Sequence, residues 1–102
     1  MEIYARQGDL VIERLREPLD EESLVQQDSP VLSGISSGHR HHIVGPALVS
    51  VTGRVTRLRI SRPTQLVHES VDGHFTVELT PGDYEIRPLR ERGDVVDRAV
   101  ED

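Results

Sequence analysis

Five histidines stand between positions 39 and 74, and imidazole is the commonest metal ligand in proteins. Three of them occur together in the segment Gly38-His39-Arg40-His41-His42. If this segment is a β-strand, His39 and His41 lie on the same face, because successive side chains alternate between the two faces. Two imidazoles on one face of a strand can chelate a single ion. His39 and His41 are therefore the first candidate metal ligands.

The other two histidines flank an Asp-Gly dipeptide at 72–73, which is a strong signal for a two-residue hairpin turn. With this turn His68 pairs with Val77, and directly paired residues share a face. The face that carries His68 is otherwise apolar, so we expect this side chain to point into the core and to need a polar partner there. The opposite face, which carries Glu69 and His74, is more polar.

A metal ion shared with the first histidine group would supply that partner. Three imidazoles around an ion with an open coordination position suit zinc, iron, manganese or nickel. We therefore predict a divalent transition-metal site with His39, His41 and His68 as ligands. His74 is the next candidate ligand if the turn is looser, and Glu69 could be a fourth ligand or a general base. The alternative is that His68 hydrogen-bonds a backbone carbonyl and the other histidines lie at the surface.

The arginines form a second pattern of possible functional residues. Arg57 and Arg59 share a strand face and could contact an anion or another subunit, while Arg40 could orient an anionic ligand beside the histidines. The alternative is an ordinary solvated face. The sequence has no nucleophile elbow and no phosphate loop, so no reaction follows from it, and whether the protein is an enzyme stays open.

The elements that must position these residues are β-strands, because the apolar residues recur with period two along most of the chain. Segment 18–29 is polar and acidic and is expected to be a loop with at most one helical turn, and 90–102 is a charged tail. Strands at this spacing predict an all-β fold in one domain over residues 1–102, a small antiparallel sandwich or barrel. About eight strands are expected, at residues 9–15, 31–35, 40–44, 47–52, 55–60, 64–71, 74–79 and 83–89.

The composition limits the functional classes. The 102 residues contain no cysteine, which excludes disulfides, thiolate ligands and a cysteine nucleophile. No apolar run has the length of a signal peptide or a membrane span, so we expect a cytoplasmic protein without membrane contact. The net charge of −6 argues against general nucleic-acid binding, although residues 31–68 contain five arginines and no acid. That segment could bind an anion, a nucleic acid or a protein, or pair with acids elsewhere in the fold.

Four motifs resemble, in this order along the chain, a family of small uncharacterised bacterial and phage proteins. In that family a second histidine follows shortly after a His-Glu pair, and here the role would fall to His74. The resemblance implies a shared histidine site rather than a named activity. The motifs are Arg6-Gln7-Gly8-Asp9, Gly38-His39-Arg40-His41, His68-Glu69, and Pro81-Gly82-Asp83-Tyr84-Glu85-Ile86 through Arg90-Glu91.

A weaker resemblance is to the cupin superfamily. Gly34 followed by His39-Arg40-His41 is similar to the first half of a cupin motif, and Pro81-Gly82-Asp83 is similar to its later turn. The glutamate that cupins have after His-x-His is absent, and so is the histidine after the Pro-Gly turn. The resemblance implies a cupin-like small barrel with a rearranged site.

Two functional classes remain open. The first is a metal-binding β domain, which predicts a stoichiometric metal ion that is lost on His41→Ala. The second is a non-catalytic module, of the kind found in phages, that forms a homo-oligomer or docks a protein partner along exposed strand edges. It predicts a defined oligomer that chelators do not affect.

Overall fold

The computed structural model describes residues 2–7, 9–32, 40–70 and 73–88, and most of these lie in β-strands. One turn of 3-10 helix, η1 (Glu21–Ser23), is capped by the Asp20 carboxylate, which accepts a hydrogen bond from the Glu22 backbone N–H. The strands in this part of the chain are β1 (Glu2–Gln7), β2 (Leu10–Arg14), β3 (Val25–Asp28), β4 (Val31–Leu32), β5 (Arg40–Ile43), β6 (Pro46–Thr52), β7 (Val55–Ile60), β8 (Thr64–Ser70), β9 (Gly73–Leu79) and β10 (Gly82–Pro88).

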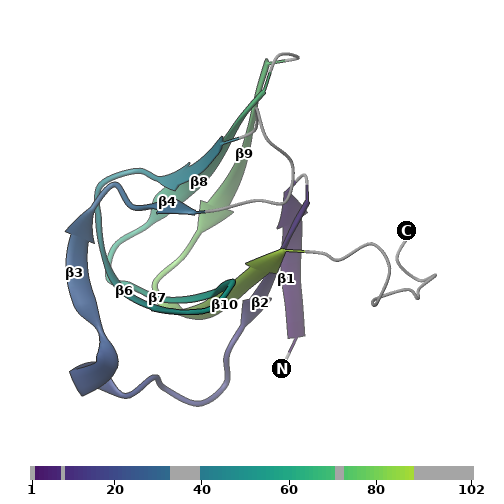
Figure 1. Cartoon of the computed structure of the whole chain (residues 1–102). Coiled ribbons are helices and arrows are strands. Elements are labelled where there is room, and N and C mark those ends of the chain that lie inside the picture. Colours follow the sequence, from purple (N-terminus) through teal and green to yellow (C-terminus); the bar gives the residue numbers. More distant parts are fainter. Residues whose placement is uncertain (1, 8, 33–39, 71–72, 89–102) are drawn as a thin grey trace.

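The strands form two antiparallel sheets that face each other across a common interior (Figure 1). The larger sheet has six strands in the order β1-β2-β10-β7-β6-β3, and the smaller has four in the order β4-β5-β8-β9. The predicted all-β fold is confirmed. The two sheets make a sandwich rather than a single closed barrel.

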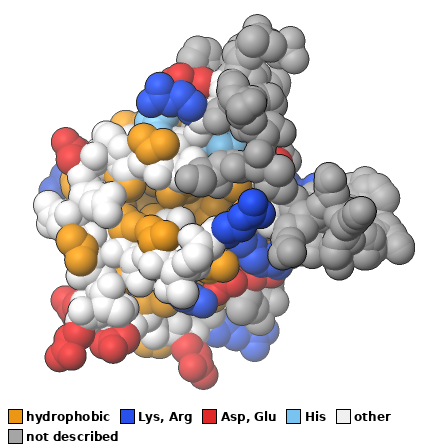
Figure 2. Space-filling model, viewed as in Figure 1, with side chains coloured by type: hydrophobic (Ala, Val, Ile, Leu, Met, Phe, Trp, Pro, Cys, Tyr) orange, Lys and Arg blue, Asp and Glu red, His pale blue; other side chains and the backbone are white. Residues whose placement is uncertain are grey.

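The core lies between the sheets and is built from alternate residues of each strand. In β7 and β10 every second side chain is buried, which is the period-two pattern of a strand with one solvent-facing side. Tyr84 is fully buried, and its hydroxyl donates a hydrogen bond of 2.6 Å to the Thr80 carbonyl. Hydrophobic side chains gather in a hollow on the face of the molecule shown in Figure 2. The buried hydrophobic cluster comprises Leu10, Ile12, Leu32, Ile43, Ala47, Val49, Leu58, Ile60, Leu66, Leu79, Tyr84 and Ile86.

Strand β1 joins the two sheets along one side of the sandwich. The Tyr4 hydroxyl donates to the Glu78 carbonyl of β9 at 2.9 Å, and the Gln7 side-chain amide donates to the Leu66 carbonyl of β8 at 2.8 Å. These contacts set the end of β1 against the four-stranded sheet. The residues around the β1–β2 connection therefore lie next to the histidine-bearing strands.

Two strands were not expected from the sequence. Strand β1 precedes the first predicted strand, and β3 lies inside segment 18–29, which was expected to be a loop. All four residues of β3 are exposed, and this strand pairs with β6 alone at the edge of its sheet. A polar strand exposed on both faces carries no alternating apolar signal, so the sequence pattern could not reveal it.

The β8–β9 hairpin has a register two residues from the predicted one. His68 pairs with Phe75 instead of Val77, and Gly73, predicted to be a turn residue, pairs with Ser70 as the first residue of β9. A shift of two residues leaves every side chain on the same face, so the apolar pattern cannot distinguish the two registers. The predicted inward direction of His68 is accordingly confirmed, since its side chain is buried.

In the described part of the chain, no helix is long and apolar enough to cross a membrane. The predicted tail at 90–102 lies outside the described residues.

Candidate functional site: a buried histidine cluster

Two of the predicted ligands are direct cross-strand neighbours. Strands β5 and β8 pair antiparallel with His41 opposite His68. Both side chains are on the core face, and His41 is fully buried. Their rings stack with centroids 4.2 Å apart and planes only 14° from parallel. The sheet register thus brings together two histidines that are 27 positions apart in the sequence.

Two polar side chains from the start of the chain complete the cluster. The Gln7 amide oxygen lies 3.0 Å from Nδ1 of His41, and the Asp9 carboxylate lies 3.1 Å from Nε2 of the same ring. Gln7 is buried at the end of β1, whereas 19% of the Asp9 side chain is exposed. Both ring nitrogens of His41 therefore face oxygen atoms, and the cluster reaches solvent on the Asp9 side.

The hydrogen bonds of Gln7 fix which nitrogen of His41 carries a proton. The Gln7 Nε2 amide group donates to the Leu66 carbonyl, so its oxygen must be the atom that faces His41. An amide oxygen can only accept, and Nδ1 of His41 is then the donor. In the neutral ring Nε2 would carry a lone pair directed at the Asp9 carboxylate. Two acceptors at 3.1 Å repel unless a cation lies between them, and that cation is either a proton or a metal ion.

The same distance suits two ligands of one metal ion. Zinc–nitrogen and zinc–oxygen bonds are about 2.1 Å long, and two such bonds that end 3.1 Å apart enclose an angle of about 95°. Within the described residues, however, no group of three or more His, Cys, Asp or Glu side chains is arranged to hold a metal ion. A complete site would need a ligand from outside them. His39, the predicted ligand one strand period before His41, lies outside the described residues.

His42 and Glu69 lie on the other face of the four-stranded sheet. Glu69 is opposite Arg40 on one side and His74 on the other, and its carboxylate is 4.0 Å from Nδ1 of His42. The structure describes the backbone of His74 but not its side chain. Glu69 is thus separated from His41 and His68 by the thickness of the sheet.

The two arginines predicted as anion contacts are paired with acids of β10. Arg57 donates to Glu85 at 3.2 Å, and Arg59 donates to Asp83 at 3.0 Å. The hydrogen bond to Asp83 raises the pKa of Arg59. These contacts neutralise both guanidinium groups on the outer face of the six-stranded sheet.

Sequence reasoning missed Gln7 and Asp9 as members of the cluster. Both lie in the Arg6-Gln7-Gly8-Asp9 motif, which contributed to the family resemblance but received no chemical role. Their position depends on the contact of β1 with β8, which connects residues 59 positions apart. The family resemblance that this motif suggested was the one available signal, because no local pattern predicts so distant a contact.

The fold and the cluster define a small antiparallel β-sandwich with a buried histidine pair beside an aspartate. The chain belongs to the family described as a domain of unknown function, DUF8820, whose model matches residues 6–88. The matched stretch contains the whole cluster and every strand except the first four residues of β1. No curated protein and no solved structure matches the chain.

Proposed function

We propose that this domain binds one divalent transition-metal ion between Asp9 and His41, with His39 as a further ligand. The observation that carries the proposal is the approach of the Asp9 carboxylate to Nε2 of His41 at 3.1 Å, with the proton of the ring directed to Gln7 on its other side. A metal ion between the two atoms would be coordinated by both of them, and their repulsion would be removed.

The surroundings of His41 support the same proposal. Metal-bound histidines commonly donate their second ring N–H to an oxygen acceptor, which fixes the tautomer and orients the ring. The Gln7 amide oxygen provides such an acceptor and is itself held by the Leu66 carbonyl. His68 stacks on His41 and so helps to hold the ring of that ligand in place.

The chemistry of the donors narrows the choice of ion. Imidazole and carboxylate donors without thiolate suit zinc, iron, manganese or nickel. We propose metal binding and no reaction, because no described residue beside the cluster has an identified catalytic role. Glu69, predicted as a possible base, faces away from it.

The test measures metal content and thermal stability together. The untagged protein is reconstituted in turn with Zn²⁺, Fe²⁺, Mn²⁺ and Ni²⁺, passed through gel filtration, analysed for metal by mass spectrometry and melted with and without EDTA. We expect about one ion per chain and a higher Tm with metal, since an ion at 100 times its Kd stabilises the native state by about 2.7 kcal/mol. The matched variants are Asp9→Asn and His41→Gln in the cluster, and His42→Gln on the opposite face of the same strand.

We expect the two cluster variants to lose the ion and His42→Gln to keep it. If the native protein holds no ion after reconstitution with any of the four metals, the proposal is wrong and the cation between Asp9 and His41 is a proton. Equal loss of metal in all three variants would also contradict it, because it would show a nonspecific surface site.

A further inference from the structure

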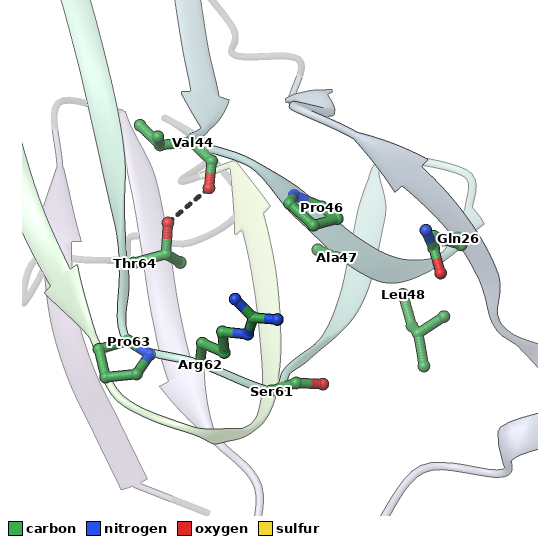
Figure 3. A pocket seen from close by; sticks show the side chains of 9 residues that line it. All are labelled: Gln26, Val44, Pro46, Ala47, Leu48, Ser61, Arg62, Pro63 and Thr64. Atoms are coloured by element: carbon green, nitrogen blue, oxygen red, sulfur yellow. Dashed lines mark hydrogen bonds between the residues drawn. The ribbon is translucent and has the colours of Figure 1, made fainter.

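A pocket of about 390 Å³ opens where the chain crosses from one sheet to the other, away from the histidine cluster (Figure 3). It lies between the beginning of β6 and the segment that joins β7 to β8. Its apolar walls are Val44, Pro46, Leu48 and Pro63, and Arg62 reaches into it from the crossover segment. Its volume is within the usual range for small-molecule sites, about 300–1,000 Å³.

The pocket is open because β6 and β7 diverge at this point. Their pairing begins with Leu48 opposite Arg59, so Pro46 and Ala47 have no partner in β7. Strand β7 ends at Ile60, and the chain then turns toward the other sheet. Proline at the first position of β6 has no N–H to donate to a neighbouring strand. The proline in the sequence therefore accounts for the divergence of the two strands at this point.

Arg62 differs from the arginines of β7 and β10. Arg57, Arg59 and Arg87 each contact a carboxylate at 3.0–3.2 Å. Arg62 forms no ion pair or hydrogen bond with the described residues, and no acidic residue lines the pocket. In a chain of net charge −6, this pocket thus has an uncompensated positive charge beside apolar walls.

We propose that this pocket binds a small monocarboxylate with an apolar body. The guanidinium group of Arg62 matches a carboxylate with two parallel N–H donors. The proline, valine and leucine walls would cover a ring or a branched chain attached to it. A single cation in an acidic protein favours a monoanion over a phosphate dianion, which would need further positive charge.

The neighbouring polar groups leave Arg62 as the main anchor. The Thr64 hydroxyl already donates to the Val44 carbonyl across the mouth of the pocket (Figure 3). Gln26, on the β3 side, is exposed and could donate to a bound carboxylate through its amide. Removal of the Arg62 charge is accordingly expected to abolish most of the affinity.

The experiment is a ¹H–¹⁵N NMR titration with benzoate in EDTA-containing buffer, repeated with neutral benzamide. The variants are Arg62→Gln and, as the matched control, Arg54→Gln, which removes an exposed arginine in the β6–β7 turn. We expect saturable shifts at the amides of Ser61, Arg62 and Ala47 with benzoate. Benzamide should bind at least tenfold more weakly, Arg62→Gln should weaken benzoate at least tenfold, and Arg54→Gln should leave it unchanged.

Three results would overturn the proposal: no saturable shift, equal affinity for benzoate and benzamide, or unchanged benzoate binding in Arg62→Gln. Shifts confined to Gln7, His41 and His68 would also overturn it, because they would place the probe at the histidine cluster. Arg62 is exposed, so its variant should keep the native spectrum elsewhere, which the same measurement checks.

Discussion

The outer face of the six-stranded sheet and the buried cluster at His41 satisfy their polar groups in different ways. On the outer face arginines and acids alternate across β7, β10 and β2, so that Arg57 contacts Glu85 and Arg87 contacts Glu13, each at 3.2 Å. In the cluster, one chain of hydrogen bonds runs from His41 through Gln7 to a backbone carbonyl. Water can replace a lost partner on the outer face but has little access to the buried Gln7 and His41 side chains.

This difference predicts where the chain tolerates change. An exposed ion pair contributes little to stability because both partners are well solvated when they separate. A buried polar group that loses its partner retains the full cost of its desolvation, about 1–3 kcal/mol. Substitutions in the cluster should therefore destabilise the fold more than substitutions of paired charges on the outer face.

The largest effect is expected for Gln7→Ala. This change removes the donor to the Leu66 carbonyl and the acceptor for His41, both in a buried position. We expect a loss of about 1–3 kcal/mol in the free energy of unfolding, measured by urea denaturation in EDTA. The matched control is Gln65→Ala, because Gln65 is exposed and donates to Glu78 at 2.9 Å. Similar losses in both variants would show that burial does not decide the cost of a lost side-chain hydrogen bond.

An intermediate effect is expected for Asp83→Asn. Although burial alone raises the pKa of the Asp83 carboxyl, hydrogen bonds from Arg59 and from the Leu19 N–H outweigh it, and the net pKa is lowered. The Asn variant weakens the acceptor for Leu19, which we expect to cost about 1 kcal/mol near neutral pH. Urea denaturation at pH 7 measures this loss.

The pH dependence of Asp83→Asn follows from the sign of the shift. A carboxyl whose folded pKa lies below its unfolded value, near 3.9, contributes its full stability above that value. The contribution disappears as the pH falls through the lower folded pKa. The difference between the native protein and Asp83→Asn should therefore shrink as the pH falls below the unfolded pKa and through the lower folded one. A difference that stays constant over this range would show that Asp83 is not linked to folding through its charge.

The sequence predicted what depends on local pattern and missed what depends on distant contacts. Period-two alternation located most of the strands and the inward direction of His68, because alternation decides the face of a side chain. The exposed strand β3 has no such pattern, and a two-residue register shift at β9 leaves the pattern unchanged. Gln7 and Asp9 reach His41 only through the packing of β1 against β8, which no nearby residue encodes.

The smallest effect is expected for Arg57→Gln on the outer face. The Arg57 side chain is 38% exposed, and Glu85 also lies 4.0 Å from Arg87, so this carboxylate keeps a cationic neighbour after the change. We expect a loss of about 0.5 kcal/mol or less, because water already solvates part of the guanidinium group. A double-mutant cycle with Glu85→Gln isolates the pair itself, and 0.5 M NaCl should reduce its coupling further because salt screens exposed charges. A coupling free energy above 1 kcal/mol that salt does not alter would show that this pair behaves like the buried cluster. The difference between the two regions would then not hold.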